Sequence, residues 1–154
     1  MPTVYGDRVD EIPARLATKP SWLITQLAVH VRRLVFDGFA EAGARGYHYR
    51  VLAALHEFGA ASQAELARRC GMDRSDVVAA VNELAEQGCV ERRPDPDDRR
   101  RNTVTLTKEG ERHLRRMDRV LDSVQDELFE PLSAEDRRTL TRLLTRLLTH
   151  HKPG

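Results

Sequence analysis

The arginine-rich stretch from Glu91 to Arg101, with the sequence ERRPDPDDRRR, holds the side chains best suited to bind a charged partner. A guanidinium group forms paired hydrogen bonds with a phosphate or with the edge of a base, and a nearby carboxylate can orient it. Pro94 and Pro96 stiffen the stretch, so the arginines are held in place. It contains five arginines, Arg92, Arg93, Arg99, Arg100 and Arg101, and four acids, Glu91, Asp95, Asp97 and Asp98. Binding by such a stretch requires that the arginines be segregated on one surface.

Other kinds of chemistry find no support in the sequence. It contains no glycine-rich phosphate loop and no GxSxG motif. Cys70 and Cys89 form no CxxC pair, and we interpret them as reduced thiols that fill space. The six histidines, His30, His48, His56, His113, His150 and His151, form no HxxxH or HExxH pair. We therefore expect no enzyme, no catalytic residue, no metal site and no cofactor.

The size and composition of the chain are those of one globular unit. It has 154 residues, 40% of them hydrophobic, and a net charge of +1. No apolar run approaches the ~18 residues that span a bilayer, and the N-terminus lacks the basic-then-apolar order of a signal peptide. We expect a cytoplasmic protein with no membrane partner. Residues 1–18 are polar and punctuated by proline, which predicts a loose N-terminal arm.

Two short helices joined by a tight turn are predicted just before the arginine-rich stretch. Ser62 is followed three residues later by Glu65, which is the spacing of a capping box, and Gly71 ends the first helix. The second helix covers residues 74–88, with Asp73 placed to cap it. Small and branched residues that permit a close crossing are Leu66, Ala67, Val77 and Ala80. This is a helix-turn-helix plan, whose second helix can lie in the DNA major groove, although an ordinary helical hairpin has the same pattern.

The residue pattern changes to alternation after Gly88. The segments CVERR and NTVTLT read as two strands joined by PDPDDRR, which makes a hairpin with a charged tip. A helix-turn-helix followed by such a hairpin is a winged-helix arrangement. A wing can reach the adjacent minor groove, where the negative potential favours arginine. The alternative is a solvated charged hairpin with no partner.

Long helices are predicted on both sides of this middle region. Apolar residues recur at three- and four-residue spacing over residues 23–35, 114–128 and 140–148. An intramolecular core is one explanation of these stripes, and a seam against a second copy is the other. Because a short chain rarely covers three stripes alone, we favour a seam and expect residues 19–46 and 111–150 to be dimerisation helices.

The segment ASQAELARRCGMDRSDVVAAVNELAEQGCVERRPDPDDRRRNTVTLTKEG resembles the DNA-binding core of MarR-type transcriptional regulators. Its most specific part is DPDDRR followed by a strand that ends in LTKEG, and the resemblance covers about residues 20–150. It implies a mainly α fold with a small β-hairpin wing, in which a winged helix-turn-helix lobe at residues 47–110 is flanked by N- and C-terminal dimerisation helices. It also implies a homodimer that binds a pseudo-palindromic site in double-stranded DNA and regulates transcription as a repressor.

The resemblance also implies roles for particular residues. In the wing, Asp98 matches an aspartate that orients an arginine, here Arg100, into the minor groove, and Arg99 and Arg101 are then candidate phosphate contacts. The position that often carries a base-reading arginine in relatives is Ala79 here, so specificity is expected to rest more on the wing and on DNA shape. Asp76 has a second interpretation, as part of the helix cap. The predicted DNA-contacting set is Ser62, Gln63, Arg74, Ser75, Asp76, Asn82, Arg93, Asp98, Arg99, Arg100 and Arg101.

An effector site is a further expectation, since many regulators of this kind bind small aromatic or anionic ligands between the dimerisation helices and the DNA-binding lobe. The candidate lining residues are Trp22, Gln26, His30, Tyr47, His48 and Arg50. The alternative is that the aromatic residues among them anchor a dimer interface. For the function as a whole, the alternative is a winged-helix module that binds another protein and no DNA.

Overall fold

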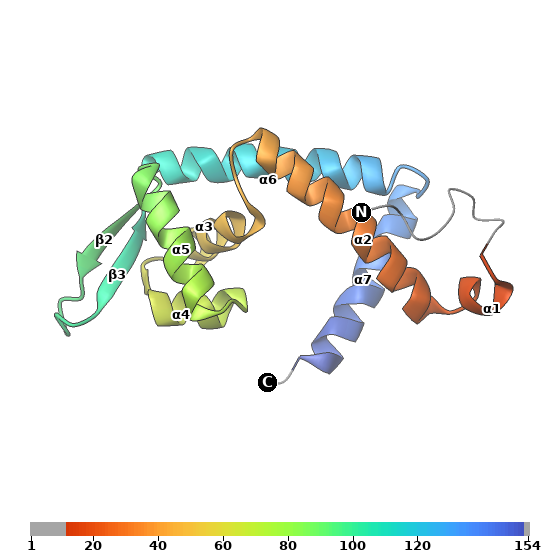
Figure 1. The fold of residues 1–154 in the computed structure, drawn as a ribbon, viewed down its shortest axis with the longest axis horizontal. Coiled ribbons are helices and arrows are strands. Elements are labelled where there is room, and N and C mark those ends of the chain that lie inside the picture. Colours follow the sequence, from red (N-terminus) through yellow and green to blue (C-terminus); the bar gives the residue numbers. More distant parts are fainter. Residues whose placement is uncertain (1–11, 153–154) are drawn as a thin grey trace.

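The computed structural model describes residues 12–152, which form helices α1 to α7 and a three-stranded sheet. In chain order the elements are α1 (Ala14–Ala17), α2 (Pro20–Glu41), α3 (Gly46–Phe58), β1 (Ala61–Ser62), α4 (Gln63–Cys70), α5 (Arg74–Glu86), β2 (Val90–Pro94), β3 (Asn102–Leu106), α6 (Lys108–Leu128) and α7 (Ala134–His151). Figure 1 shows α6 running from a lobe of α3, α4, α5 and the strands to a lobe of α1, α2 and α7. Over residues 12–152, no helix has both the length and the apolar character needed to cross a bilayer.

Local sequence signals set the ends of the helix-turn-helix. The Oγ of Ser62 accepts a hydrogen bond from the backbone N–H of Glu65 at 3.2 Å, which satisfies one of the free amides at the start of α4. Gly71 follows the last residue of α4 with a φ of 60°, in the left-handed region that favours glycine. Asp73 stands at the N-cap of α5 as predicted, but its side chain makes no capping hydrogen bond.

A shared core holds α3, α4 and α5 together. Leu66 of α4 and Val77 and Ala80 of α5 are fully buried, which confirms the predicted crossing of the two helices. Leu52 of α3 and Val104 of β3 belong to the same cluster. Because burial of a large aliphatic side chain contributes roughly 1.5–3 kcal/mol, this cluster fixes α5 against its neighbours.

The predicted hairpin is present as the β2 and β3 strands of an antiparallel sheet with the order β1-β3-β2. In its register Val90 lies opposite Leu106, and Arg92 lies opposite Val104. The strand β1 pairs with β3 and was not expected from the sequence. Two residues are too few to show the alternation that identifies a strand.

The N-terminal arm differs in part from the expectation. Residues 14–17 form the short helix α1, which follows Pro13 and consists of the strong helix formers ARLA. The preceding residues 1–11 of the predicted arm lie outside the described residues.

The apolar stripe at residues 114–128 is largely covered within the chain. Its buried members are Leu114, Met117 and Val124. Helix α2 crosses α6 so closely at Gly38 that an added Cβ would lie 2.8 Å from Val120 Cγ1. The periodicity of a helix identifies its apolar face and not what covers it, and contacts within the chain cover most of this stripe. Besides Leu16 of α1, the exposed leucines of the described residues are on the first half of α2 and on α7: Leu23, Leu27, Leu143, Leu144, Leu147 and Leu148.

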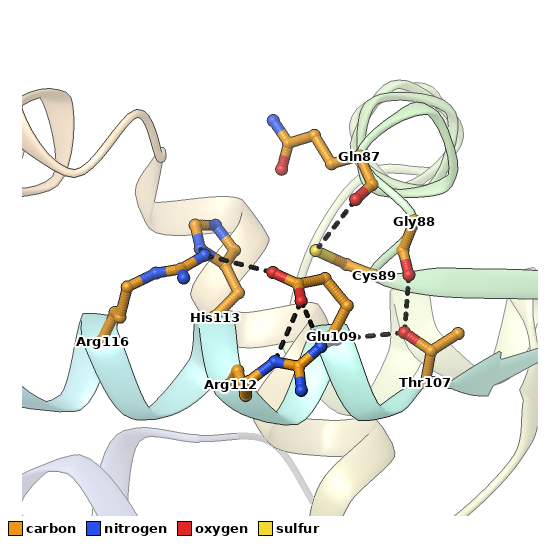
Figure 2. Close-up of polar contacts among 9 residues, drawn as sticks. Gln87, Gly88, Cys89, Thr107, Glu109, Arg112, His113 and Arg116 are labelled. Carbon is orange, nitrogen blue, oxygen red and sulfur yellow. Dashed lines mark hydrogen bonds and ion pairs between the residues drawn. The ribbon is translucent and has the colours of Figure 1, made fainter.

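The start of α6 is tied to the end of α5 and to the first wing strand (Figure 2). The Thr107 hydroxyl donates a hydrogen bond to the Gly88 carbonyl at 2.6 Å and accepts one from the Gly110 N–H at 3.0 Å. The Thr107 N–H donates to the Cys89 carbonyl at 3.1 Å. A Cβ added to Gly110 would overlap that carbonyl oxygen and lie 2.6 Å from Leu106 Cδ1. The close approach of the two backbones therefore requires glycine at this position.

Both cysteines are free thiols with packing roles. Cys89 is buried at the base of the wing, and Cys70 is half-buried at the end of α4. Burial raises the pKa of both thiols. They are therefore poor nucleophiles, which agrees with their interpretation as residues that fill space.

His113 is buried in α6, next to the same junction (Figure 2). Its Nδ1 accepts a hydrogen bond from the Arg116 guanidinium at 3.0 Å, and no group among the described residues bonds to its Nε2. Burial, followed by the charges of Arg116 and His48, holds the pKa of His113 below its ordinary value of 6.5, although Glu109 opposes this. The fold therefore favours the neutral imidazole.

Replacing Gly110 with alanine tests the close approach of α6 to β2. We expect Gly110→Ala to lower the free energy of unfolding by about 1–3 kcal/mol, because the new methyl group overlaps a backbone carbonyl that cannot move alone. Thermal unfolding followed by circular dichroism measures the change. The matched control is Gly46→Ala, where an added Cβ meets nothing within 4 Å. Equal melting temperatures for the two variants would contradict the packing described.

Replacing His113 with leucine tests the buried imidazole. Below the ordinary pKa of 6.5 the unfolded chain takes up a proton that the folded chain resists, so stability is full above that pH and falls as the pH drops below it. We expect the melting temperature of His113→Leu to fall less between pH 7.5 and pH 5 than that of the wild-type protein. The control is His56→Gln, which removes an exposed histidine. A control that flattened the pH dependence as much as His113→Leu would refute the assignment.

Candidate nucleic-acid interface

Helix α5 has one buried face and one exposed face. Its buried side chains are Val77, Ala80, Val81 and Leu84. Arg74, Ser75 and Asp76 are exposed in its first turn, so these three members of the predicted contact set lie together. Ala79 is exposed as well, so this position of the helix presents only a methyl group. The major groove of DNA is wide enough to admit an α-helix, and Arg74 is the basic side chain in the first turn of this exposed face.

Asn82, three residues after Ala79 on this helix, contacts the wing. Its side-chain carbonyl accepts a hydrogen bond from the Arg92 guanidinium. Arg92 lies opposite the buried Val104 in the hairpin, so it is on the side of the strand that faces α5. Arg93 lies on the other side and pairs with Glu91 at 3.1 Å. The predicted contact set includes Arg93 and does not include Arg92, and the alternation of strand residues places the two on opposite sides of the strand.

A small arginine-lined cavity lies where α4, α5 and the wing meet. Its volume is about 240 Å³, and we call it the arginine cradle. It is lined by Ser62, Gln63, Ala64, Arg74, Arg100, Arg101 and Asn102. The Arg101 guanidinium donates a hydrogen bond to the Ser62 hydroxyl at 3.3 Å. The cradle therefore combines guanidinium groups with the start of α4, where backbone amides and the helix dipole favour an anion.

The acids at the tip of the wing bond to its backbone. An Asp98 side-chain oxygen accepts a hydrogen bond from the Arg100 N–H at 3.0 Å, and an Asp95 oxygen accepts one from the Asp97 N–H at 2.9 Å. The Arg101 carbonyl accepts a further bond from the Asp95 N–H at 2.8 Å. These contacts stiffen the turn, and Asp98 acts on the backbone of Arg100. The exposed side chains Arg99, Arg100 and Arg101 are thus held out from an ordered tip.

The predicted effector residues are divided between two regions. Trp22, Gln26 and His30 lie on the first half of α2, the half nearer α1 in Figure 1, whereas Tyr47, His48 and Arg50 lie at the start of α3. His48 borders a cavity of about 580 Å³ between the end of α2 and the end of α5. This cavity is lined by Phe36, Ala40, Gly43, Ala44, Arg45, His48, Glu83, Glu86 and Gln87. None of the three α2 candidates lines it, so the cavity does not unite the predicted set.

Metal coordination has no support in the described part of the chain. Across residues 12–152, no group of three or more His, Cys, Asp and Glu side chains is arranged to hold a metal ion.

Comparison with known proteins agrees with this geometry. Residues 44–101 match the MarR family. A putative transcriptional regulatory protein for the hcr operon of Thauera aromatica is 32% identical over 130 residues, which cover 79% of this chain and 78% of that protein.

Solved structures share most of this architecture. The PcaV transcriptional regulator of Streptomyces coelicolor, in complex with its natural ligand, is similar with a TM-score of 0.74 and 28% identity, covering 92% of this chain and 99% of that one. A mutant MarR from E. coli in complex with operator DNA has a TM-score of 0.71 and 24% identity, covering 83% of this chain and 92% of that one. The second likeness bears on the fold alone.

The fold, the matched segment and the curated relative lead to one conclusion. The winged helix-turn-helix and its flanking helices were predicted and are confirmed. The Thauera relative and PcaV are both regulators of transcription, and the expectation that the chain is not an enzyme is also confirmed. This chain belongs to the MarR family and is a DNA-binding transcriptional regulator.

Proposed function

We propose that the protein is a cytoplasmic homodimer that represses transcription by binding a pseudo-palindromic operator. The observation that carries this proposal is the arginine cradle, which opens beside the exposed face of α5. Each protomer places α5 in a major groove, with the two half-sites about one helical turn, ~10 bp, apart. The MarR variant of E. coli was solved with operator DNA, and its likeness in fold supports binding to an operator.

The cradle and the wing share the contacts to the DNA backbone. A phosphate seated in the cradle receives hydrogen bonds from Arg74 and Arg101 and from the first amides of α4. Arg100 extends from the ordered wing tip into the adjacent minor groove, and Arg99 contacts a neighbouring phosphate. Arg92 joins this set beside Asn82. These arginines concentrate positive charge on one surface of a nearly neutral chain.

Base readout rests on few side chains. Arg74 can bond to guanine through two acceptors, and Ser75 and Asp76 are exposed next to it. The carbonyl of Asn82 is engaged by Arg92, which leaves its amide group for a base. Because Ala79 offers only a methyl group, the shape and deformability of the DNA under the wing contribute much of the specificity.

A small aromatic or anionic effector is the proposed signal that modulates this binding. Support comes from PcaV, which was solved with its natural ligand. Of the predicted lining residues, His48 borders the cavity of about 580 Å³ next to α5. A ligand there touches the helix that carries the base-reading residues, so its binding can alter the position of that helix.

The dimer is proposed from the apolar surface that the chain leaves uncovered. A groove of about 530 Å³ separates the first half of α2 from α7. It is lined by Ile24, Leu27, Ala28, Val31, Arg32, Leu128, Phe129, Pro131, Leu132, Leu140 and Leu144. Leu147 and Leu148 continue the apolar face of α7 and are 50% and 57% exposed. Such a contiguous apolar surface is typical of a subunit interface, and a second copy provides the same helices to cover it.

Replacing Arg100 with alanine tests DNA binding by the wing. We expect weaker binding to duplex DNA from the upstream region of the protein's own gene, and a plot of log affinity against log salt whose slope is smaller by about one. Fluorescence anisotropy at several salt concentrations measures both. Arg115→Ala, which removes an exposed arginine from α6, is the matched control.

Unchanged affinity together with an unchanged salt slope in Arg100→Ala would refute the role of the wing. Absence of any duplex binding by the wild-type protein would instead favour a winged-helix module that binds another protein.

Replacing Leu144 with glutamate tests the dimer. Leu144 is 42% exposed and lines the apolar groove, so a carboxylate there is buried without a partner if two copies meet on this face. We expect light scattering at micromolar concentration to give a dimer for the wild-type protein and a monomer for Leu144→Glu, with a loss of operator affinity. Thr139→Glu, on the same helix and outside the groove, should remain dimeric. A monomeric wild-type protein would rule out the seam.

A further inference from the structure

One turn of α3 contacts both the recognition helix α5 and the two helices α2 and α6. The turn consists of Tyr47, His48 and Tyr49, and we call it the aromatic triplet. Its first two members bond to α5, and its third member contacts α2 and α6. Three adjacent residues point around a helix at about 100° intervals, so a single turn can reach elements on different sides.

Toward α5, the triplet holds the carboxylate of Glu83. The Nε2 of His48 lies 2.6 Å from a Glu83 oxygen, and the Tyr47 hydroxyl donates a hydrogen bond to the same carboxylate at 3.2 Å. The Arg45 backbone N–H donates to the Nδ1 of His48 at 3.3 Å. Nδ1 is therefore an acceptor, which leaves Nε2 to carry the proton and donate it to Glu83.

Both His48 and Glu83 are held in place. His48 is only 2% exposed, so DNA cannot touch it and its effect on binding must pass through another residue. The hydrogen bond from His48 is the largest cause that lowers the pKa of Glu83, and Tyr47 and Arg45 add to it. Glu83 is therefore an ionised acceptor, and charge-assisted bonds of this kind are roughly twice as strong as neutral ones.

On its other side, the triplet is fixed to the helices that lead to the dimer surface. The Tyr49 hydroxyl donates a hydrogen bond to the Asp118 carboxylate of α6 at 2.7 Å. Its ring stacks on Phe39 of α2, with the ring centroids 5.8 Å apart. Burial and the charge of Asp118 raise the pKa of Tyr49 to about 12, so the phenol keeps the proton that it donates.

We propose that the aromatic triplet sets the angle between α5 and the dimerisation helices, and with it the separation of the two recognition helices. This inference rests on the proposed binding of a dimer to two half-sites. Helix α6 has 21 residues and is about 30 Å long, so a tilt of roughly 6° at one end moves the other by ~3 Å. That displacement is about the rise of one base pair. Glu83, His48 and Tyr49 are thus positioning residues for half-site spacing.

The test compares operators that differ only in spacing. The probe is the duplex with two half-sites that wild-type protein selects from a random-sequence pool, together with versions whose spacer is one base pair longer or shorter. The variants are Glu83→Ala and Tyr49→Phe, and Glu57→Ala is a control that removes an exposed acid from α3. A variant that was only less stable would lose affinity equally for all three duplexes.

We expect the wild-type protein and Glu57→Ala to bind the altered duplexes at least about tenfold more weakly than the selected one. For Glu83→Ala and Tyr49→Phe the loss should be less than about threefold, because a looser joint lets α5 follow the displaced half-site. Glu83→Gln, which keeps an oxygen for His48 and Tyr47, should restore most of the discrimination.

The remaining outcomes would contradict either the role of the aromatic triplet or the recognition of two half-sites. Tyr49→Phe removes one hydroxyl and keeps the ring stack, so it decides the matter if Glu83→Ala fails to fold. Wild-type discrimination in both variants would overturn the inference and leave the proposed function intact. A wild-type protein that bound all three duplexes equally would overturn recognition of two spaced half-sites, and the inference with it.

Discussion

Helix α6 can begin against the first wing strand only because residue 110 has no side chain. The Cys89 carbonyl fills the space where a Cβ would lie, and Thr107 bonds to the backbone on both sides of the contact. The end of α5, the base of the wing and the start of α6 are therefore packed together at one junction. A wing held in this way loses little conformational entropy on binding, so more of each arginine contact appears as affinity.

Segregation of charge, and not net charge, makes this nearly neutral chain suited to DNA. The wing acids Asp95 and Asp98 bond to backbone amides, and Glu83 is engaged by the aromatic triplet on α3. The guanidinium groups of Arg100 and Arg101 are left to surround a cavity at the start of a helix. In the sequence the acidic and basic residues nearly cancel to a net charge of +1. In the fold the acids are engaged by protein groups and the arginines are gathered around the cavity, so the two kinds of charge act at different places.

Sequence patterns predicted the elements that depend on neighbouring residues. Ser62 and Gly71 mark the ends of α4, and alternation marks the hairpin, because capping and strand pairing are read within a few positions. The same reasoning missed the two-residue strand β1 and the contact of Arg92 with α5. It also grouped residues of α2 and α3 as an effector site, whereas the three α2 residues do not line the cavity that His48 borders. Periodicity gives the apolar face of each helix and not the point where two helices cross.

The residue types and their spacing were enough to establish a helix-turn-helix, a stiff arginine-bearing wing and flanking apolar helices, because these features arise from local backbone preferences and from the period of burial. Long-range packing decided which apolar stripe serves the core: Met117 and Val124 are buried against the chain itself, and the leucines of α7 remain exposed. It also brought His48 and Glu83, 35 residues apart, to within 2.6 Å. Contacts of that range depend on how helices cross, and no local pattern of residues encodes the crossing.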